Sequence, residues 1–168
     1  MKKYFLLVFV LFFVACGYKP TVNITKETLK GNVYIDTPIN KDNIRNSILI
    51  RESLIEMFSG KFNMNVVNDK SKANLFVVGK LVSVSHSALE SSLGYAKLYR
   101  ESVNVSLSYK GNNVPSKTIT ASDYYDYFVD DDSVLTQEKK DDAIEQAINN
   151  ALLLIPSQIA ISTLKYDE

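Results

Sequence analysis

Three stretches of alternating sequence, LFVVGKLVSVSH (residues 75–86), AKLYRESVNVSLSYK (96–110) and KTITASDYYDYFV (117–129), decide the fold of this chain. Successive side chains of a strand point to opposite faces of its sheet, and the middle stretch places its large apolar residues on one face. These residues are Val103, Val105, Leu107 and Tyr109. The first stretch begins apolar on both faces, which is typical of a central strand, and Gly111-Asn112-Asn113 indicates a hairpin turn before the third. The three stretches therefore predict strands of one sheet.

Shorter elements surround these strands. Residues 32–36 predict a strand that ends before Pro38, because proline lacks the N–H that a strand ladder needs. Residues 62–66 alternate apolar and polar side chains, as a half-buried strand does. The polar residues 68–74 predict a turn, and the serine-rich residues 85–94 predict a loop between the two longest strands.

Apolar residues that recur every three or four positions predict two helices. The first spans about residues 41–61, with Asn40 as its N-cap and Ser59-Gly60 at its end. Its predicted buried stripe consists of Ile44, Ile48, Leu54, Ile55 and Phe58. The second spans about residues 136–164, and Pro156 inside it is expected to kink it. Its predicted buried stripe consists of Ile144, Ile148, Ala151, Ile155 and Ile159.

The order of elements is therefore β-α-β-β-β-β-α, which predicts the α+β class. We expect a two-layer sandwich in which two helices pack on one face of a mainly antiparallel or mixed sheet. The other face of the sheet must then be solvated or covered by a partner. By its length the chain predicts a single domain, over residues 29–168.

The first residues of the chain predict a secretory signal. Lys2 and Lys3 precede eleven uncharged, mostly apolar residues (4–14), a run too short to span a membrane as a helix. The sequence Phe13-Val14-Ala15-Cys16 resembles the lipobox of bacterial lipoproteins, with Phe13 in place of the usual leucine. The resemblance implies a signal peptide over residues 1–15, cleavage before Cys16 and acylation, for instance with palmitate, of that cysteine. Residues 16–28 would then tether the domain to a membrane, since two or three acyl chains anchor a protein stably.

Composition excludes several classes of function. Removal of Lys2 and Lys3 with the signal leaves 17 basic side chains against 19 acidic ones, a net charge of about −2. Such a balance argues against general nucleic-acid binding, which requires a basic face. Cys16 is the only cysteine, so an intrachain disulfide is impossible.

No catalytic or metal-binding pattern stands out. His86 is the only histidine, which makes a zinc site improbable, and a surface histidine at a strand end is the favoured interpretation. Residues 130–132 are three aspartates, but they lack the glycine and the distal glutamate of a calcium loop. We therefore expect neither an enzyme nor a cofactor.

Two sets of side chains remain as binding candidates. Basic residues along the long strands would pair with the phosphates of an anionic lipid if they point outward together, whereas ordinary solvated charges are the alternative. These are Lys80, Lys97, Arg100, Lys110 and Lys117. Tyrosines that alternation leaves exposed would suit a protein interface, although core packing remains an equal alternative. The candidates for such contacts are Tyr99, Tyr124, Tyr125 and Tyr127.

The mature chain would begin Cys16-Gly17-Tyr18-Lys19-Pro20, which resembles the Cys-Gly-aromatic opening of the LPS-assembly lipoprotein family LptE. The predicted order of elements is also similar to that family. The resemblance implies a lipoprotein without catalytic activity at the periplasmic face of the outer membrane. Such a protein plugs an LptD-type β-barrel, helps that barrel assemble and binds lipopolysaccharide. Gly17, in place of the aspartate that retains lipoproteins at the inner membrane, agrees with this location.

Two alternatives stay open. A lipid-anchored scaffold or adaptor of another envelope complex shares every feature except the detailed element order. A lipid-anchored periplasmic enzyme would have to build its active site with His86 as its one histidine.

Overall fold

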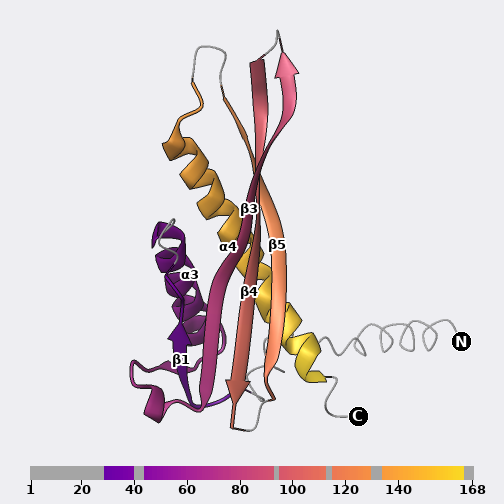
Figure 1. The fold of residues 1–168 in the computed structure, drawn as a ribbon. Coiled ribbons are helices and arrows are strands. Elements are labelled where there is room, and N and C mark those ends of the chain that lie inside the picture. The colour runs from indigo at the N-terminus through magenta and orange to yellow at the C-terminus, as the bar shows by residue number, and fades with distance from the viewer. Residues whose placement is uncertain (1–28, 40–43, 93–94, 113–114, 130–133, 165–168) are drawn as a thin grey trace, which may run out of the picture.

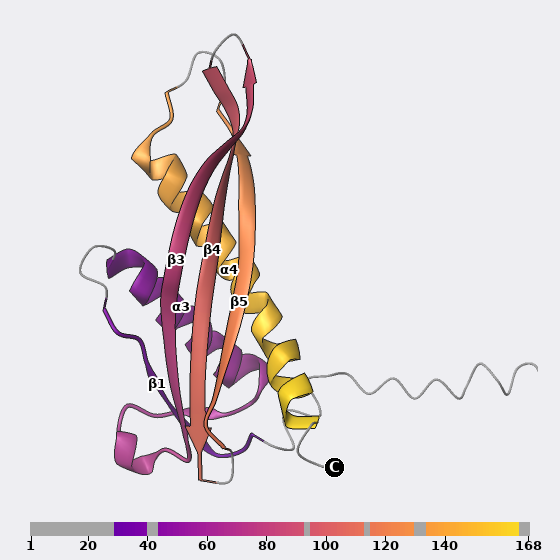
Figure 2. The same ribbon diagram turned by 45° about the vertical axis from the view of Figure 1, so that its right-hand side comes forward.

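The computed structural model describes residues 29–39, 44–92, 95–112, 115–129 and 134–164. They form one five-stranded sheet with two helices on the same face (Figure 1), and Figure 2 shows both helices behind the strands. The predicted α+β two-layer class is therefore confirmed. Cys16, the signal sequence and the tether lie outside the described residues, as does Asn40.

The elements follow the predicted order. They are β1 (Asn32–Asp36), α3 (Ile44–Glu56), the π-helix η1 (Met57–Lys61), β2 (Asn65–Val66), the 3-10 turn η2 (Lys70–Lys72), β3 (Leu75–Ser92), β4 (Tyr95–Gly111), β5 (Lys117–Phe128) and α4 (Gln137–Leu164). The sheet has the order β2-β1-β3-β4-β5. β1 pairs in parallel with β2 and β3, whereas β3, β4 and β5 form an antiparallel meander. The sheet is mixed, as expected.

The predicted serine-rich loop is wrong. Residues 85–92 continue β3, which pairs with β4 as far as Ser92↔Tyr95. Serine favours loops because its hydroxyl competes for backbone hydrogen bonds. Here β4 satisfies the backbone of β3 along its whole length, and tertiary pairing overrides the weak local preference.

The core lies between the sheet and the two helices. Every second residue of the strands faces it, so that Gly79, Leu107 and Ile119 stand side by side across three strands. α4 covers β4 and β5, and its predicted stripe from Ile144 to Ile159 is buried throughout. We call the face that carries α3 and α4 the helix face, and the other the open face.

α3 is a helix, and its predicted stripe is right only in part. Leu54 and Phe58 are fully buried and Ile55 packs against the core, but Ile44 and Ile48 are 52% and 50% exposed. Ile50, which was not part of the predicted stripe, is fully buried. The buried set also includes Asn46 and Ser47, which are polar and therefore gave no hydrophobic signal. The helix is apolar on two adjoining sides, and the sequence pattern does not show which of them meets the sheet.

The first helix ends at Lys61, as predicted, but its last five residues, Met57–Lys61, form the π-helix η1. Phe58 and Phe62 meet there edge to face, with ring centroids 5.3 Å apart. Phe62 is consequently buried before β2 begins, and only Asn65–Val66 of the predicted strand 62–66 pairs with the sheet.

α4 begins with a side-chain cap. Oγ1 of Thr136 accepts a hydrogen bond from the backbone N–H of Lys139, 3.2 Å away. The helix runs through Pro156 to Leu164. The effect of Pro156 on its direction stays a prediction.

Candidate functional site

The open face of the sheet is lined by hydroxyl-bearing side chains. On β4 the residues of this face are Ser102, Asn104, Ser106 and Ser108; opposite them on β5 lie Thr118, Thr120 and Ser122, and β3 adds Ser83, Ser85 and Ser87. Hydroxyls donate and accept hydrogen bonds equally well. Oδ1 of Asn104 is buried in the middle of this array and has no hydrogen-bond partner among the described residues. The face is therefore polar and rich in hydrogen-bonding groups.

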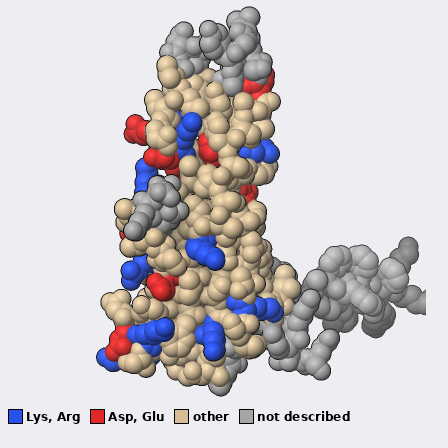
Figure 3. All heavy atoms as spheres, viewed as in Figure 1, with Lys and Arg blue, Asp and Glu red and all other residues tan. Residues whose placement is uncertain are grey.

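Two of the predicted basic residues lie on this face. Lys80 stands opposite Ser106, and Lys110 stands opposite Phe76. Both lysines are exposed. Their positions along β4 differ by four residues, a separation of about 14 Å. In Figures 1 and 2 the sheet lies in front of α4, so Figure 3 looks onto the open face, and its lower half shows basic groups with few acidic neighbours.

Arg100 also lies on the open face, but its guanidinium is already engaged. Nε and Nη2 donate to the two carboxylate oxygens of Asp126 at 2.6 and 2.7 Å. Its Cζ lies 3.6 Å from the ring centroid of Tyr124, a cation–π contact. The hydrogen bonds from Arg100 hold the pKa of Asp126 below its ordinary value. Arg100 and Tyr124 thus form a fixed unit with Asp126.

Lys117 does not point outward, contrary to the prediction of a shared basic face. Lys117 lies two residues before Ile119 in β5 and therefore shares the helix face with it. Its Nζ donates a hydrogen bond to the backbone carbonyl of Ser162 in the last turn of α4, 3.0 Å away. A cation there interacts favourably with the helix C-terminus. Lys97 lies in β4, and its side chain is outside the described part of the structure.

The helix face holds an aromatic cluster that sequence analysis missed in part. The ring of Tyr99 stacks on those of His86 and Tyr127, with centroids 5.1 and 5.8 Å away. Nδ1 of His86 lies 2.5 Å from Oε1 of Glu101, and the hydroxyl of Tyr127 donates to the same oxygen at 3.0 Å. These four residues come from β3, β4 and β5.

The carboxylate at the centre of this cluster is almost fully buried. Glu101 is 1% exposed, so its side-chain oxygens need hydrogen-bond partners within the protein, and His86 and Tyr127 both lie within hydrogen-bonding distance of Oε1. Burial raises the pKa of Tyr127, and the hydrogen bond to Glu101 raises it further. The signal for Glu101 was present in the sequence: it shares its phase with Val103 and Val105, which places it on the helix face.

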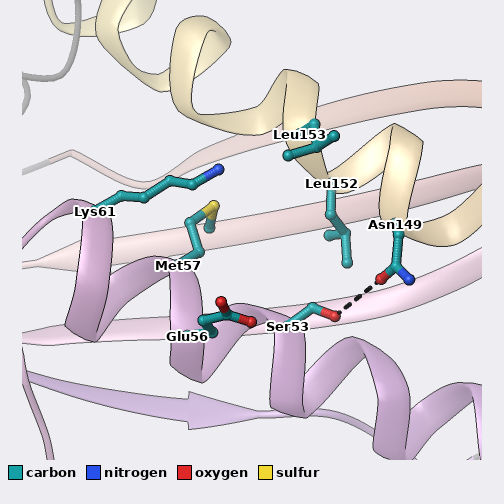
Figure 4. A pocket seen from close by; sticks show the side chains of 7 residues that line it. All are labelled: Ser53, Glu56, Met57, Lys61, Asn149, Leu152 and Leu153. Atoms are coloured by element: carbon teal, nitrogen blue, oxygen red, sulfur yellow. Dashed lines mark hydrogen bonds between the residues drawn. The ribbon is translucent and has the colours of Figure 1, made fainter.

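Hollows lined by described residues border the helices, and two of them are large enough to consider. One, of about 320 Å³, is lined by residues of β5 and the first turns of α4, among them Tyr125, Tyr127 and Phe128. The other, of about 290 Å³, lies between α3 and α4, where Met57, Leu152 and Leu153 form the apolar part (Figure 4). Ser53 and Asn149 meet across it at 3.4 Å. Both hollows are shallow and have mixed linings, and neither gathers a catalytic set.

Metal and membrane signals are weak in the described part of the chain. No group of three histidine, cysteine or acidic side chains lies close enough to hold a metal ion there. Among the same residues, no helix combines the length and apolar character needed to cross a bilayer.

The sequence profile of the LptE lipopolysaccharide-assembly family matches residues 31–158, more than half of the chain. The chain belongs to the LptE family. LptE-family proteins are lipoproteins of the bacterial envelope that assist assembly and have no catalytic activity. The matched region runs from the start of β1 into α4, so it contains the whole sheet with its open face.

Solved structures of two other proteins share this fold. A lipoprotein from Caulobacter crescentus superposes with a TM-score of 0.55 at 14% identity, over 88% of this chain and 97% of that chain. The rare lipoprotein B from Shewanella oneidensis gives a TM-score of 0.54 at 17% identity, over 82% and 99%. At these identities the likeness shows the fold alone. No curated protein matches the sequence.

Proposed function

We propose that this chain is an outer-membrane lipoprotein that lodges as a plug in an LptD-type β-barrel, helps that barrel assemble and binds lipopolysaccharide during its delivery to the cell surface. The observation that carries the proposal is the family match over residues 31–158. The sheet supports it, because one of its two faces is left uncovered by the helices and is rich in polar groups.

Lipidation of Cys16 would place the domain at the membrane. The sequence ahead of it has the charged start, the apolar run and the small residue of a signal that is removed by cleavage. Gly17 favours the outer membrane, and residues 16–28 would act as the tether. Membrane attachment then depends on the lipid and leaves the domain free to engage a partner in the periplasm.

The open face supplies groups suited to lipopolysaccharide. Lys80 and Lys110 offer ammonium groups to phosphates, and the hydroxyls between them match the hydrogen-bonding groups of sugars. Lys97 remains a candidate on sequence grounds. Arg100 and Lys117 fit less well, because each already has a partner within the chain.

The tyrosines proposed for barrel contacts divide into two kinds. Tyr99 and Tyr127 are stacked within the aromatic cluster, where they stabilise the chain's own sheet. Tyr124 and Tyr125 are 47% and 40% exposed, although Arg100 covers one face of the Tyr124 ring. Of the four, these two are the better candidates for contacts with the barrel.

Co-purification tests the proposal. Tagged protein from the native host, extracted in mild detergent, should bring down an LptD-type barrel in roughly equal amount, as a stable plug does. A Cys16→Ser variant controls for membrane placement and should retain little barrel. Wild-type protein that is lipidated yet consistently free of any barrel would contradict the proposal.

A scaffold or adaptor of another envelope complex is the alternative. The hydroxyl-rich centre of the open face is compatible with it, because a polar sheet face suits weak protein contacts as well as sugars. Recovery of another envelope complex in place of the barrel would support this second function.

A further inference from the structure

β3 has a long edge that no described strand covers. β1 pairs with only the first four residues of β3, from Leu75 to Val78, whereas β3 continues to Ser92. β1 ends there because Pro38 cannot donate to the ladder. In Figure 1, β1 stops low on the sheet and β3 extends far beyond it. Within the described part of the chain, residues 79–92 therefore present unpaired backbone groups on one side.

The middle of this edge is a regular strand of six residues. Residues 83–88 pair without interruption with β4, from Ser83↔Asn104 to Ala88↔Tyr99. The register shifts on both sides of them, where Val82 and Leu89 are extra residues. In an antiparallel pair alternate residues direct both N–H and C=O away from the partner. Half of the six thus offer a donor and an acceptor outward, over the length of a typical strand.

The middle of this edge lacks side chains that would prevent pairing. Natural edge strands are protected by charges, proline or bulges. Here the bulges lie only at the two ends of the six-residue stretch, and residues 81–89 contain neither a proline nor a lysine, arginine or carboxylate. Val82, Val84 and Leu89 are instead 54%, 39% and 45% exposed. Their apolar surface would be removed from water by an added strand.

The opposite edge of the sheet is better protected. β5 carries charged side chains along its length, including Asp123 and Asp126. The backbone carbonyl of Tyr124 already accepts a hydrogen bond from Nδ2 of Asn150 in α4. The β3 edge is therefore the more receptive of the two.

α3 presents an exposed apolar surface beside this edge. Arg45 reaches Asp142, and Ser53 reaches Asn149, which marks the side of α3 that faces α4. At 100° per residue, Ile44 and Ile48 lie about 180° and 140° from Ser53 around the helix. α3 packs against β1 and β3, and its N-terminal turns run beyond Gly79, which contacts Ile50. Ile44 and Ile48 are thus exposed on the flank along which β1, if it continued, would run.

We propose that residues 83–88 pair with an extended segment of the barrel partner, which adds a strand to the sheet in line with β1. This inference rests on the proposed function. The added strand would be uncharged, with apolar side chains over Val84, Ile44 and Ile48 on the helix face and polar ones on the open face. A second copy of this chain fits poorly. α3 projects beyond the β3 edge, and the copy would bring its own α3 into the same space.

Amide hydrogen exchange tests the pairing directly. The full lipidated chain is measured alone and in complex with the co-expressed LptD-type barrel. Alternate amides among residues 83–88 should exchange about 10-fold more slowly in the complex. Unchanged rates at all six amides in a complex that does contain the barrel would overturn this inference and leave the proposed function standing. Failure of the barrel to bind the wild-type chain would overturn both.

A charged residue on the edge provides a second test. Val84→Lys places a charge on the partly exposed helix side of the strand and should lower the recovered barrel about 10-fold. Val134→Lys, at an exposed residue before α4, is the matched control and should leave recovery unchanged. Equal recovery with both variants would contradict the inference, provided that both show the wild-type unfolding midpoint. A photo-crosslinker at Ser85 should link to the barrel, and a link to a second copy would show that the named occupant is wrong.

Discussion

At the scale of single residues, Gly79 sets the distance between the sheet and α3. A Cβ at this position would lie 2.4 Å from Cδ1 of Leu54 and 3.1 Å from Cγ2 of Ile50. Both side chains are fully buried, so neither has free space into which to move. Glycine is therefore required here by close packing rather than by an unusual backbone angle.

Gly79→Ala should destabilise the fold by about 1–3 kcal/mol, the usual cost of overpacking a core. Urea unfolding followed by circular dichroism measures the change. Gly60→Ala is the control, because a Cβ there meets nothing within 4 Å; it should be neutral or slightly stabilising, since alanine favours helix. Equal stability of the wild type and Gly79→Ala would mean that α3 is not held at this distance.

Tyr127 makes the stability of the fold sensitive to alkaline pH. Its folded-state pKa is raised above the ordinary value of 10.0 by burial and by the hydrogen bond to Glu101. Above about pH 10 the unfolded chain loses this proton while the folded chain keeps it, so stability is complete below that pH and falls as pH rises. Thermal unfolding between pH 8 and pH 11 should show this loss.

Tyr127→Phe should be less stable at neutral pH, because Glu101 loses a hydrogen bond, but it should lose less stability between about pH 9 and pH 11. Tyr125→Phe is the matched control, since Tyr125 neighbours Tyr127 on the same face and is exposed. If the two variants keep parallel alkaline profiles, the buried hydroxyl of Tyr127 is not the source of the pH dependence.

At the scale of elements, the buried side was predicted fully for α4 and only in part for α3. The predicted stripe of α4 is buried throughout, whereas Leu153, Leu154 and Ile161 on other sides of that helix are exposed. α3 carries apolar residues on two sides. Its buried side includes Asn46 and Ser47, and its exposed side includes Ile44 and Ile48. Packing against the sheet, rather than periodicity, selects between the two sides.

The start of α4 depends on one cap. Thr136→Ala should lower stability by about 1 kcal/mol, because the N–H of Lys139 loses its acceptor. Thr136→Ser keeps the hydroxyl and should retain most of the stability. Urea midpoints of the three proteins check this, and a loss of equal size in both variants would show that the methyl group of Thr136 matters instead.

At the scale of the whole molecule, the two faces of the sheet have separate roles. The helix face holds the core and the buried cluster around Glu101, whereas the open face holds hydroxyls and exposed lysines. Changes on the open face should therefore alter binding without altering the fold. The proposed function can therefore be tested by reversing the charge of side chains on the open face.

Lys80→Glu combined with Lys110→Glu should weaken lipopolysaccharide binding about 10-fold or more. The two substitutions replace ammonium groups, which would attract the phosphates, with carboxylates, which would repel them. Binding of purified lipopolysaccharide to the full chain, at fixed salt, measures the effect. Lys61→Glu is the control, since Lys61 lies in η1 within the helix layer. Equal binding by the double variant and the control would contradict a site on the open face.

Short-range patterns in the sequence determined the class and order of the fold. Alternation defined β4, β5 and the first half of β3, and Pro38 ended β1. Apolar residues at helical spacing indicated the buried side of α4. Each of these depends on local geometry alone. Tertiary structure decided the rest. Pairing with β4 turned a serine-rich segment into strand, packing chose the buried side of α3, and strand register brought His86, Glu101, Tyr99 and Tyr127 together. These outcomes depend on contacts between segments far apart in the chain, and no local window of sequence contains both partners.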